Sequence, residues 1–203
     1  MNLIKLPVNI GTFHIVTPTV NFYYPVVQGL INYSVQQKMN QTIYNLMLTI
    51  IRDLKQPDLI TYISGSYEVK TNQRNVLSLS LGGLGDFHGA HPITIVKSLN
   101  FDVLTGKNYV LKELFKPGSD YQKILSDIIS QQIQERDIPL LGEFKGIRPD
   151  QDYYIADKTI IIYFQQYEIS PYYAGFPYFP IPIYQIENII NEDGLLAKMT
   201  AFF

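Results

Sequence analysis

Hydrophobic positions recur at three- and four-residue steps in two stretches of the chain. The first stretch predicts a helix over about residues 32–55 that ends before Pro57. Its apolar face consists of Val35, Met39, Ile43, Leu46, Met47, Ile50 and Leu54. The second predicts a helix over about residues 119–136, which Ser119 and Gln122 open as a capping box. One face of each helix should therefore pack on a sheet.

Hydrophobic and polar residues alternate in the middle of the chain, where they predict two hairpins. Residues 59–71 and 75–83 alternate on either side of a polar turn. Residues 93–103 form a third alternating stretch, which the turn at 104–107 connects to a short strand at 109–111. Both hairpins join antiparallel strands.

Extended structure is also predicted towards both ends. Residues 11–24 are rich in β-branched and aromatic residues, and Pro18 divides them into two extended pieces that Pro25 closes. Residues 159–169 form an almost continuous apolar run, which is typical of a buried central strand. A short helix is expected over about residues 184–190.

This order of elements predicts an α+β fold with mostly antiparallel sheets and two main helices. The connections between the predicted strands are too short for repeated βαβ crossovers. The glycine-rich residues 82–85 are the best candidate for a boundary between modules. We therefore expect two closely packed α+β modules, at residues 1–87 and 88–203.

Composition narrows the classes of function. The chain has 203 residues, of which 46% are hydrophobic and 17% charged, with a net charge of -2, so neither disorder nor nucleic-acid binding is expected. The absence of cysteine excludes a thiol nucleophile, a disulfide and a thiolate metal site, and leaves the redox compartment open.

The start of the sequence bears on localisation. Residues 1–15 are interrupted by Lys5, Pro7 and Asn9, so they lack the apolar core of a secretory signal. No stretch reaches the length of a membrane-spanning helix, so membrane insertion is not expected. A natural chain starting here would stay in the cytoplasm, whereas a chain trimmed of an anchor would have the same sequence.

Two histidines form the first candidate site. His88 and His91 could hold a metal ion from a helix, with Asp86 supplying an oxygen ligand. Gly89 and Pro92 argue against such a helix, so the sequence favours a sharp connection in which one histidine bonds to nearby backbone. We therefore expect neither a metal nor another cofactor.

Carboxylates form the second candidate. Asp86, Asp102 and Glu168 could supply the acid and the base of a glycoside hydrolase, with the many tyrosines as stacking surfaces for sugars. Among eighteen acidic residues a chance pair is inevitable, so the pattern is not specific. No serine-nucleophile motif or phosphate-binding glycine motif is present either. No catalytic residue is therefore assigned.

An aromatic, proline-rich stretch forms the third candidate. Its candidate binding residues are Tyr167, Glu168, Pro171, Tyr172, Tyr173, Phe176 and Tyr178. Rigid aromatic side chains suit recognition of a protein or a glycan at low entropic cost. The alternative, which we favour for most of these side chains, is that the stretch folds back over the sheet and covers the core. Glu168 is expected to cap or pair locally.

Three blocks of sequence resemble a known family. GAHPITIVKSLNFDVLTGKNYVLKELF at 89–115 and YFQQYEISPYYAGFPYFPIPIYQI at 163–186 are similar to two blocks of the C-terminal domain of unknown function of lysozyme-sensing anti-sigma-V factors, the RsiV-like domain. YYPVVQGLINYSVQQKMNQTI at 23–43 resembles the start of the domain that commonly precedes it. Ser170 stands where alanine is usual, and Tyr173 where a small residue is usual.

The resemblance carries expectations of its own. It implies two packed α+β modules, in a family that also occurs in some peptidoglycan deacetylases of Gram-positive bacteria. In anti-sigma-V factors the region lies outside the cytoplasm and binds lysozyme. The sequence contains no sigma-binding segment and no deacetylase domain, so neither activity is transferred, and the resemblance implies no catalytic residue.

These observations lead to one main hypothesis. We expect a non-enzymatic binding or sensor domain that recognises a lysozyme-like protein or a cell-wall glycan, through residues 166–180 together with Asp86, His88 and His91. The alternatives are a polysaccharide-active hydrolase and a stand-alone cytoplasmic protein. The sequence leaves the oligomeric state open.

Overall fold

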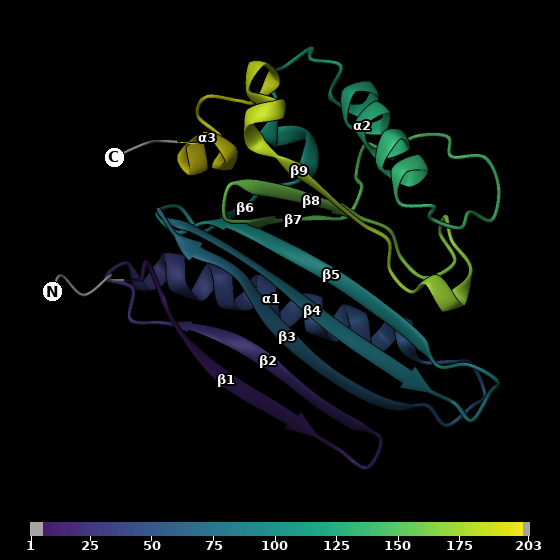
Figure 1. Ribbon diagram of the computed structural model, residues 1–203. Coiled ribbons are helices and arrows are strands. Elements are labelled where there is room, and N and C mark those ends of the chain that lie inside the picture. The colour runs from purple at the N-terminus through teal and green to yellow at the C-terminus, as the bar shows by residue number, and fades with distance from the viewer. Residues whose placement is uncertain (1–5, 201–203) are drawn as a thin grey trace, which may run out of the picture. The chain divides into compact units, whose positions relative to one another are not determined.

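The computed structural model describes residues 6–200, which form two compact units, one up to Asn108 (unit 1) and one from Tyr109 (unit 2). Figure 1 shows a helix against a large sheet in unit 1, and helices with a smaller sheet in unit 2. The division falls after Asn108 and not after residue 87, because strand β5 (Ile93–Asp102) pairs with β4 (Val76–Asp86) over ten residues. Residues 88–108 therefore complete unit 1.

Unit 1 contains a six-stranded sheet in the order β1-β2-β3-β4-β5-β6. Its remaining strands are β1 (Asn9–Val16), β2 (Val20–Gln28), β3 (Tyr62–Gln73) and β6 (Lys107–Asn108). Neighbours are antiparallel except β2 and β3, which pair in parallel at Val20, Asn21 and Phe22. The expected extended pieces around Pro18 are therefore the hairpin β1–β2.

Pro25 does not close the extended segment, contrary to expectation. It lies inside β2, opposite Thr12 of β1, and the strand continues to Gln28. The described pairing with β3 ends at Phe22, so Pro25 stands where β2 has a partner on one side only. A residue without a backbone N–H is tolerated at such a position.

Helix α1 (Tyr33–Leu54) covers one face of this sheet, as the sequence predicted (Figure 1). The side chain of Asn32 caps it by accepting a hydrogen bond from the Val35 N–H. The buried residues of the helix are Met39, Ile43, Met47, Ile50, Ile51 and Leu54. They pack with alternate residues of the sheet, such as Phe22, Leu77 and Leu79, in one hydrophobic core.

The two predicted hairpins are present, but one ends differently. Arg74 and Asn75, both at positive φ, form the tight turn between β3 and β4. Gly106 forms the turn before β6, at φ 64°, where a side chain would crowd Val35. The short strand expected at 109–111 is wrong, because Leu111–Leu114 is a turn of 3-10 helix.

Unit 2 contains a three-stranded antiparallel sheet with β8 (Thr159–Tyr163) between β7 (Tyr153–Ala156) and β9 (Tyr178–Pro182). The apolar run at 159–169 is thus a central strand, as predicted, although it leaves the sheet after Tyr163. Strand β9 lies within the stretch that was expected to be an irregular loop. It alternates buried Phe179 and Ile181 with more exposed prolines.

Helix α2 (Tyr121–Glu135) confirms the second predicted helix, but its capping box is wrong. Asp120 is the N-cap residue, and the hydroxyl of Ser119 donates to the Lys116 carbonyl. The helix buries Leu125, Ile129 and Ile133.

The end of the chain also differs from the prediction. Two 3-10 turns, Ile183–Gln185 and Glu187–Ile189, replace the helix expected at 184–190, and a short helix α3 (Leu195–Thr200) follows them. The predicted α+β class is confirmed. Within residues 6–200, no helix is both long and apolar enough to cross a membrane.

Candidate functional site

The candidate residues of the sequence lie on both units. Asp86, His88, His91 and Asp102 belong to unit 1. The others belong to unit 2, where they lie in the segment that joins β8 to β9 or, for Tyr178, at the first residue of β9. We call residues 164–177 of this segment the aromatic loop. Each unit therefore has its own set of candidate residues.

The side chains of the aromatic loop divide into exposed and half-buried sets. Tyr173 is 80% exposed and Tyr167 is 55% exposed, whereas Pro171, Tyr172 and Phe176 are half-buried. The rings of Tyr167 and Tyr172 lie 5.8 Å apart between centroids. The loop therefore covers part of the unit 2 core and also presents large aromatic side chains to solvent.

Glu168 holds the loop in place from within. One of its carboxylate oxygens accepts a hydrogen bond from the Gln165 backbone N–H at 2.7 Å, and the other pairs with the Arg148 guanidinium. The buried Gln151 amide also donates to Glu168, at 3.2 Å. The contact with Gln165 is local, as expected for Glu168, whereas Arg148 and Gln151 lie 20 and 17 positions away in the sequence. The carboxylate serves as an acceptor at the start of the loop.

A wider polar network supports this arrangement. The Gln151 amide donates to the Tyr163 carbonyl at 2.8 Å, and the Gln165 amide donates to the Asp152 carboxylate at 2.9 Å. Arg148 also lies 3.4 Å from Asp150. Charge-assisted bonds of this kind are stronger than neutral ones, so the residues before β7 fix the first turn of the aromatic loop.

Two backbone positions shape the rest of the loop. Tyr167 has a φ of 63°, which is uncommon for a residue with a side chain. Gly175 has a φ of 66° and ends the 3-10 turn Tyr172–Ala174 that places Tyr173 at the surface. A left-handed tyrosine costs free energy that the surrounding hydrogen bonds offset.

The loop borders an open groove of about 310 Å³ on unit 2. Tyr173, Phe176 and Tyr178 form one wall, and the residues after α2, including Asp137 and Pro139, form the other. Arg136 donates to the Tyr178 carbonyl at 2.7 Å and lies over the Phe179 ring. These contacts fix the end of α2 against β9.

Beside the network, Tyr121 has a perturbed acidity. Its hydroxyl donates to the Pro149 carbonyl at 3.1 Å, and its ring stacks on Phe115 with centroids 4.9 Å apart. Burial, and to a smaller extent the nearby Asp150 carboxylate, raise the pKa of Tyr121. The neutral phenol is thus the form that suits this contact.

The 86–92 turn of unit 1 is a sharp connection. Asp86 accepts a hydrogen bond from the His88 backbone N–H at 2.8 Å, and His88 has a φ of 61°. Its ring meets the Tyr62 ring edge-on at 5.6 Å. Asp86, His88 and His91 are all exposed, and the described part of the chain contains no group of three or more potential metal ligands.

The carboxylates of unit 1 do not form a hydrolytic pair. Asp102 is paired with Val76 at the first residue of β4, whereas Asp86 is the last residue of that strand. A strand of this length holds them roughly 30 Å apart, while glycosidase carboxylates lie about 5–10 Å apart. Asp102 is buried and accepts a hydrogen bond from the Leu104 N–H, which stabilises the turn.

The sequence did not identify three residues that matter at this surface. Arg148 and Gln151 lie in a segment without regular structure, and Arg136 lies just after α2. Gln151 is not part of any recognisable sequence motif, so its contact with Glu168 becomes visible only in the fold. The cluster of charges before β7 was the one available signal.

Comparison with known proteins relates part of this unit to a family. The model of the family described as "Protein of unknown function (DUF3298)" matches residues 112–184, which include α2, all three strands of unit 2 and the aromatic loop. Residues 112–184 are thus similar to this family, and we refer to them below as the DUF3298 domain. This agrees with the resemblance expected from the sequence blocks.

Curated relatives extend the similarity beyond the DUF3298 domain. The chain is 30% identical to the anti-sigma-V factor RsiV of Bacillus subtilis (strain 168) over 189 residues, or 82% of this chain. It is 28% identical to an esterase of Mycobacterium tuberculosis over 98 residues, or 44% of this chain. The chain spans 63% and 41% of the lengths of these two relatives.

Solved structures of DUF3298 proteins share the fold. A family member from Bacteroides fragilis superimposes with a TM-score of 0.73 at 12% identity, over 97% of this chain and 99% of that one. A family protein from Pseudomonas aeruginosa superimposes with a TM-score of 0.69 at 14% identity, over 92% and 95%. At these identities the likeness establishes the fold alone.

Proposed function

We propose that this chain is a non-enzymatic recognition module that binds a partner protein through the aromatic loop of its DUF3298 domain. The observation that carries the proposal is the fixed presentation of two exposed tyrosines: Tyr167 is next to the anchored Glu168, and the 3-10 turn Tyr172–Ala174 places Tyr173 at the surface. The similarity to an anti-sigma factor supports a sensor or binding role with a protein partner.

The aromatic loop suits binding because it would lose little conformational entropy when it contacts a partner. Binding must offset the entropy lost when interface side chains become fixed, and a tyrosine has only two side-chain torsions to fix. The proline and the 3-10 turn around Tyr173 already restrict the backbone. Aromatic residues of this kind dominate the binding free energy at many protein interfaces.

A titration with c-type lysozyme tests the proposal, since the RsiV-like resemblance points to that protein. Saturable binding in calorimetry is expected. Tyr173→Ala and Phe176→Ala should each raise Kd roughly 30-fold, the equivalent of about 2 kcal/mol at a central interface residue. Tyr184→Ala is the matched control, because Tyr184 is 74% exposed on the same unit but lies outside the loop.

Solubilised peptidoglycan fragments form a second arm of this experiment. Binding to the fragments alone would replace the protein partner with a cell-wall glycan at the same loop. Binding to either ligand would support a role outside the cytoplasm. If neither ligand binds, or if the loop variants and Tyr184→Ala bind equally well, the proposed recognition surface is wrong.

The esterase relative supplies a second candidate function. Hydrolysis of an ester by a serine nucleophile needs a nearby general base, usually histidine. The three histidines of this chain, His14, His88 and His91, all lie in unit 1, so the DUF3298 domain has none of its own. Turnover of p-nitrophenyl acetate above the rate of a heat-denatured sample would favour the hydrolase.

A further inference from the structure

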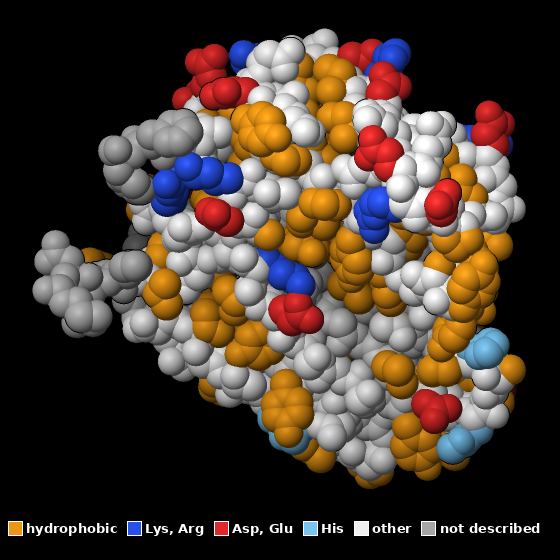
Figure 2. Space-filling model, viewed as in Figure 1, with side chains coloured by type: hydrophobic (Ala, Val, Ile, Leu, Met, Phe, Trp, Pro, Cys, Tyr) orange, Lys and Arg blue, Asp and Glu red, His pale blue; other side chains and the backbone are white. Residues whose placement is uncertain are grey.

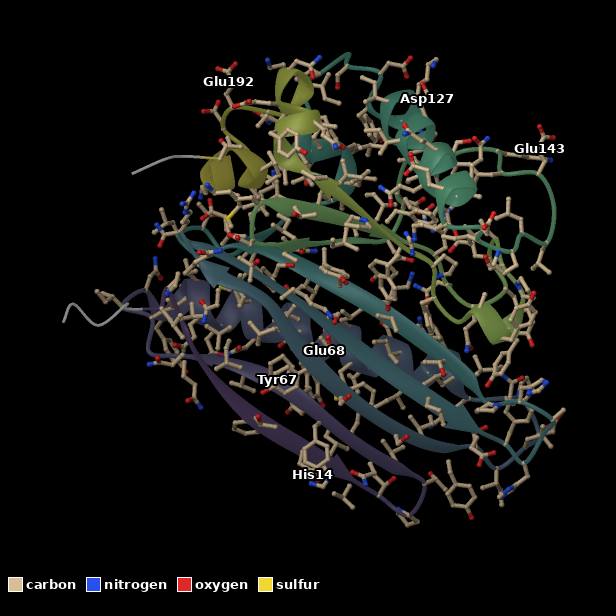
Figure 3. All side chains as sticks on the ribbon, viewed as in Figure 1. His14, Tyr67, Glu68, Asp127, Glu143 and Glu192 are labelled. Atoms are coloured by element: carbon tan, nitrogen blue, oxygen red, sulfur yellow. The ribbon has the colours of Figure 1, made fainter. Side chains whose placement is uncertain are left out.

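A trough lies on the face of the unit 1 sheet that α1 does not cover. Its volume is about 370 Å³, and it runs across the strands β2, β3, β4 and β5. Figure 1 shows α1 behind the sheet, so the opposite face is turned towards the viewer in Figure 2. Much of this face is white there, and acidic and basic side chains lie close together near its middle, where Figure 3 labels Glu68.

The pairing of the strands explains why this face is hollow. Ser66 of β3 is opposite Gly82 of β4, and Gly82 is opposite Val96 of β5. Two residues along β3, Ser64 stands between Asn21 of β2 and Leu84 of β4. Serine and glycine at the centre of these rows leave a depression between larger side chains on either side.

Tyr23 forms the aromatic wall of the trough. Its ring lies parallel to the ring of His14, with centroids 4.0 Å apart and an interplanar angle of 4°. The His14 Nε2 is in turn hydrogen-bonded to the Asn21 side-chain oxygen at 2.6 Å. Figure 3 shows His14 on β1, on the face turned away from α1. Tyr23 is thus stacked on a histidine that Asn21 holds in place, and it is still 43% exposed.

The polar groups of the trough are neutral. None of the described residues that line it is charged, and they include the Asn21 amide and the hydroxyl groups of Ser64, Ser66 and Thr94. Amides and hydroxyls can both donate and accept hydrogen bonds, as the hydroxyl groups of a sugar do. The C–H edges of a sugar ring complement the negative face of an aromatic ring.

We propose that this trough binds neutral saccharide rings, with one ring stacked on Tyr23 and its hydroxyl groups bonded to Asn21, Ser64 and Ser66. A site for an anionic ligand would need basic side chains, which the lining lacks. A peptide that adds a strand would need a free strand edge, whereas β4 is paired on both sides and β3 is paired with β2 at Ile63–Gly65, beside the trough. This site is on unit 1 and is independent of the proposed function of the aromatic loop.

Titration of the full chain with two neutral oligosaccharides, cellohexaose and N-acetylchitohexaose, tests the proposal by calorimetry. At least one should bind saturably, and Tyr23→Ala should weaken that binding at least tenfold. Tyr33→Ala is the matched control, because Tyr33 is also on unit 1 and is 67% exposed. The aromatic loop is unaltered in these variants, so its own binding should persist.

A filling substitution separates binding from folding. A Cβ added at Gly82 would meet only the Val96 side chain, at 3.8 Å, so the fold has room for a larger residue. Gly82→Thr should abolish saccharide binding while the melting temperature stays equal or rises, because threonine favours strands and fills the hollow. If neither oligosaccharide binds, or if Gly82→Thr binds as well as the unaltered chain, the saccharide site is refuted.

Discussion

Ser170 is a buried polar residue whose hydroxyl group makes no hydrogen bond to the described residues. Its side chain is 1% exposed, and its Oγ has no hydrogen-bond partner among the described residues. A hydroxyl removed from water without a partner loses free energy relative to the unfolded chain. Alanine, the usual residue at this place in the RsiV-like sequence block, avoids that loss.

Ser170→Ala should therefore stabilise the protein, by about 1 kcal/mol in the free energy of unfolding. Urea unfolding followed by circular dichroism measures the change. Ser126→Ala provides the contrast, because the Ser126 hydroxyl accepts from the Ile147 N–H and donates to the Gln122 carbonyl. That variant should be less stable, and a destabilised Ser170→Ala would mean that its hydroxyl has a partner such as bound water.

At the scale of elements, the aromatic loop depends on contacts made before β7. Glu168 accepts hydrogen bonds from the Gln165 backbone and the Gln151 amide, and its side chain is 20% exposed. Arg148 is 45% exposed and also approaches Asp150 and Asp152. Glu168 therefore contributes more than Arg148 to fixing the aromatic loop.

Glu168→Ala should cost about 1–3 kcal/mol of unfolding free energy, because it leaves partly buried donors without an acceptor. Arg148→Ala should cost clearly less, since its exposed charge is screened by solvent. Chemical unfolding of both variants gives the comparison. Equal losses would contradict the role of Glu168 as the acceptor that orders the loop.

The sequence predicted elements well where a periodic pattern was long. The helices at 33–54 and 121–135 and the hairpin at Arg74–Asn75 follow from spacing and turn chemistry alone. Strand β9 was missed, because its prolines alternate with buried residues and resemble a loop. The ends of helices were harder to predict. Ser119, for example, was expected to cap the second helix, but its hydroxyl donates to the Lys116 carbonyl in the preceding turn.

The candidate site was predicted only in outline. The aromatic character of residues 167–178 is visible in the sequence, but the division between exposed and half-buried rings depends on the path of the loop. The contacts of Glu168 with Gln151 and Arg148 join residues 17 and 20 positions apart without any shared motif. The trough beside Tyr23 depends on the register of four strands, which no local pattern specifies.

At the scale of the whole molecule, each unit has the parts of an independent domain. The core between α1 and the six-stranded sheet consists entirely of unit 1 residues, and it includes Leu99 and Phe101 of β5. Unit 2 buries Leu125 and Ile129 of α2 and Ile160 of β8. We infer that the boundary between the two independently folding domains lies after β6 and not before β5.

Truncation tests this boundary. Residues 1–108 alone should unfold cooperatively in urea, as a small domain with its own core does. Residues 1–87 should not, because the loss of β5 exposes one edge of β4 and removes Leu99 and Phe101 from the core. A cooperative transition in the shorter piece would support the earlier boundary at residue 87.

The parallel pairing of β2 with β3 has a consequence for how unit 1 assembles. The antiparallel pairs of its sheet all join strands that follow each other in the sequence, but Val20–Phe22 must meet Ile63–Gly65 across the whole of α1. Loop-closure entropy delays contacts between distant residues until intervening structure has formed. We therefore expect the hairpin β1–β2, and with it the aromatic wall of Tyr23, to join the rest of unit 1 late in folding.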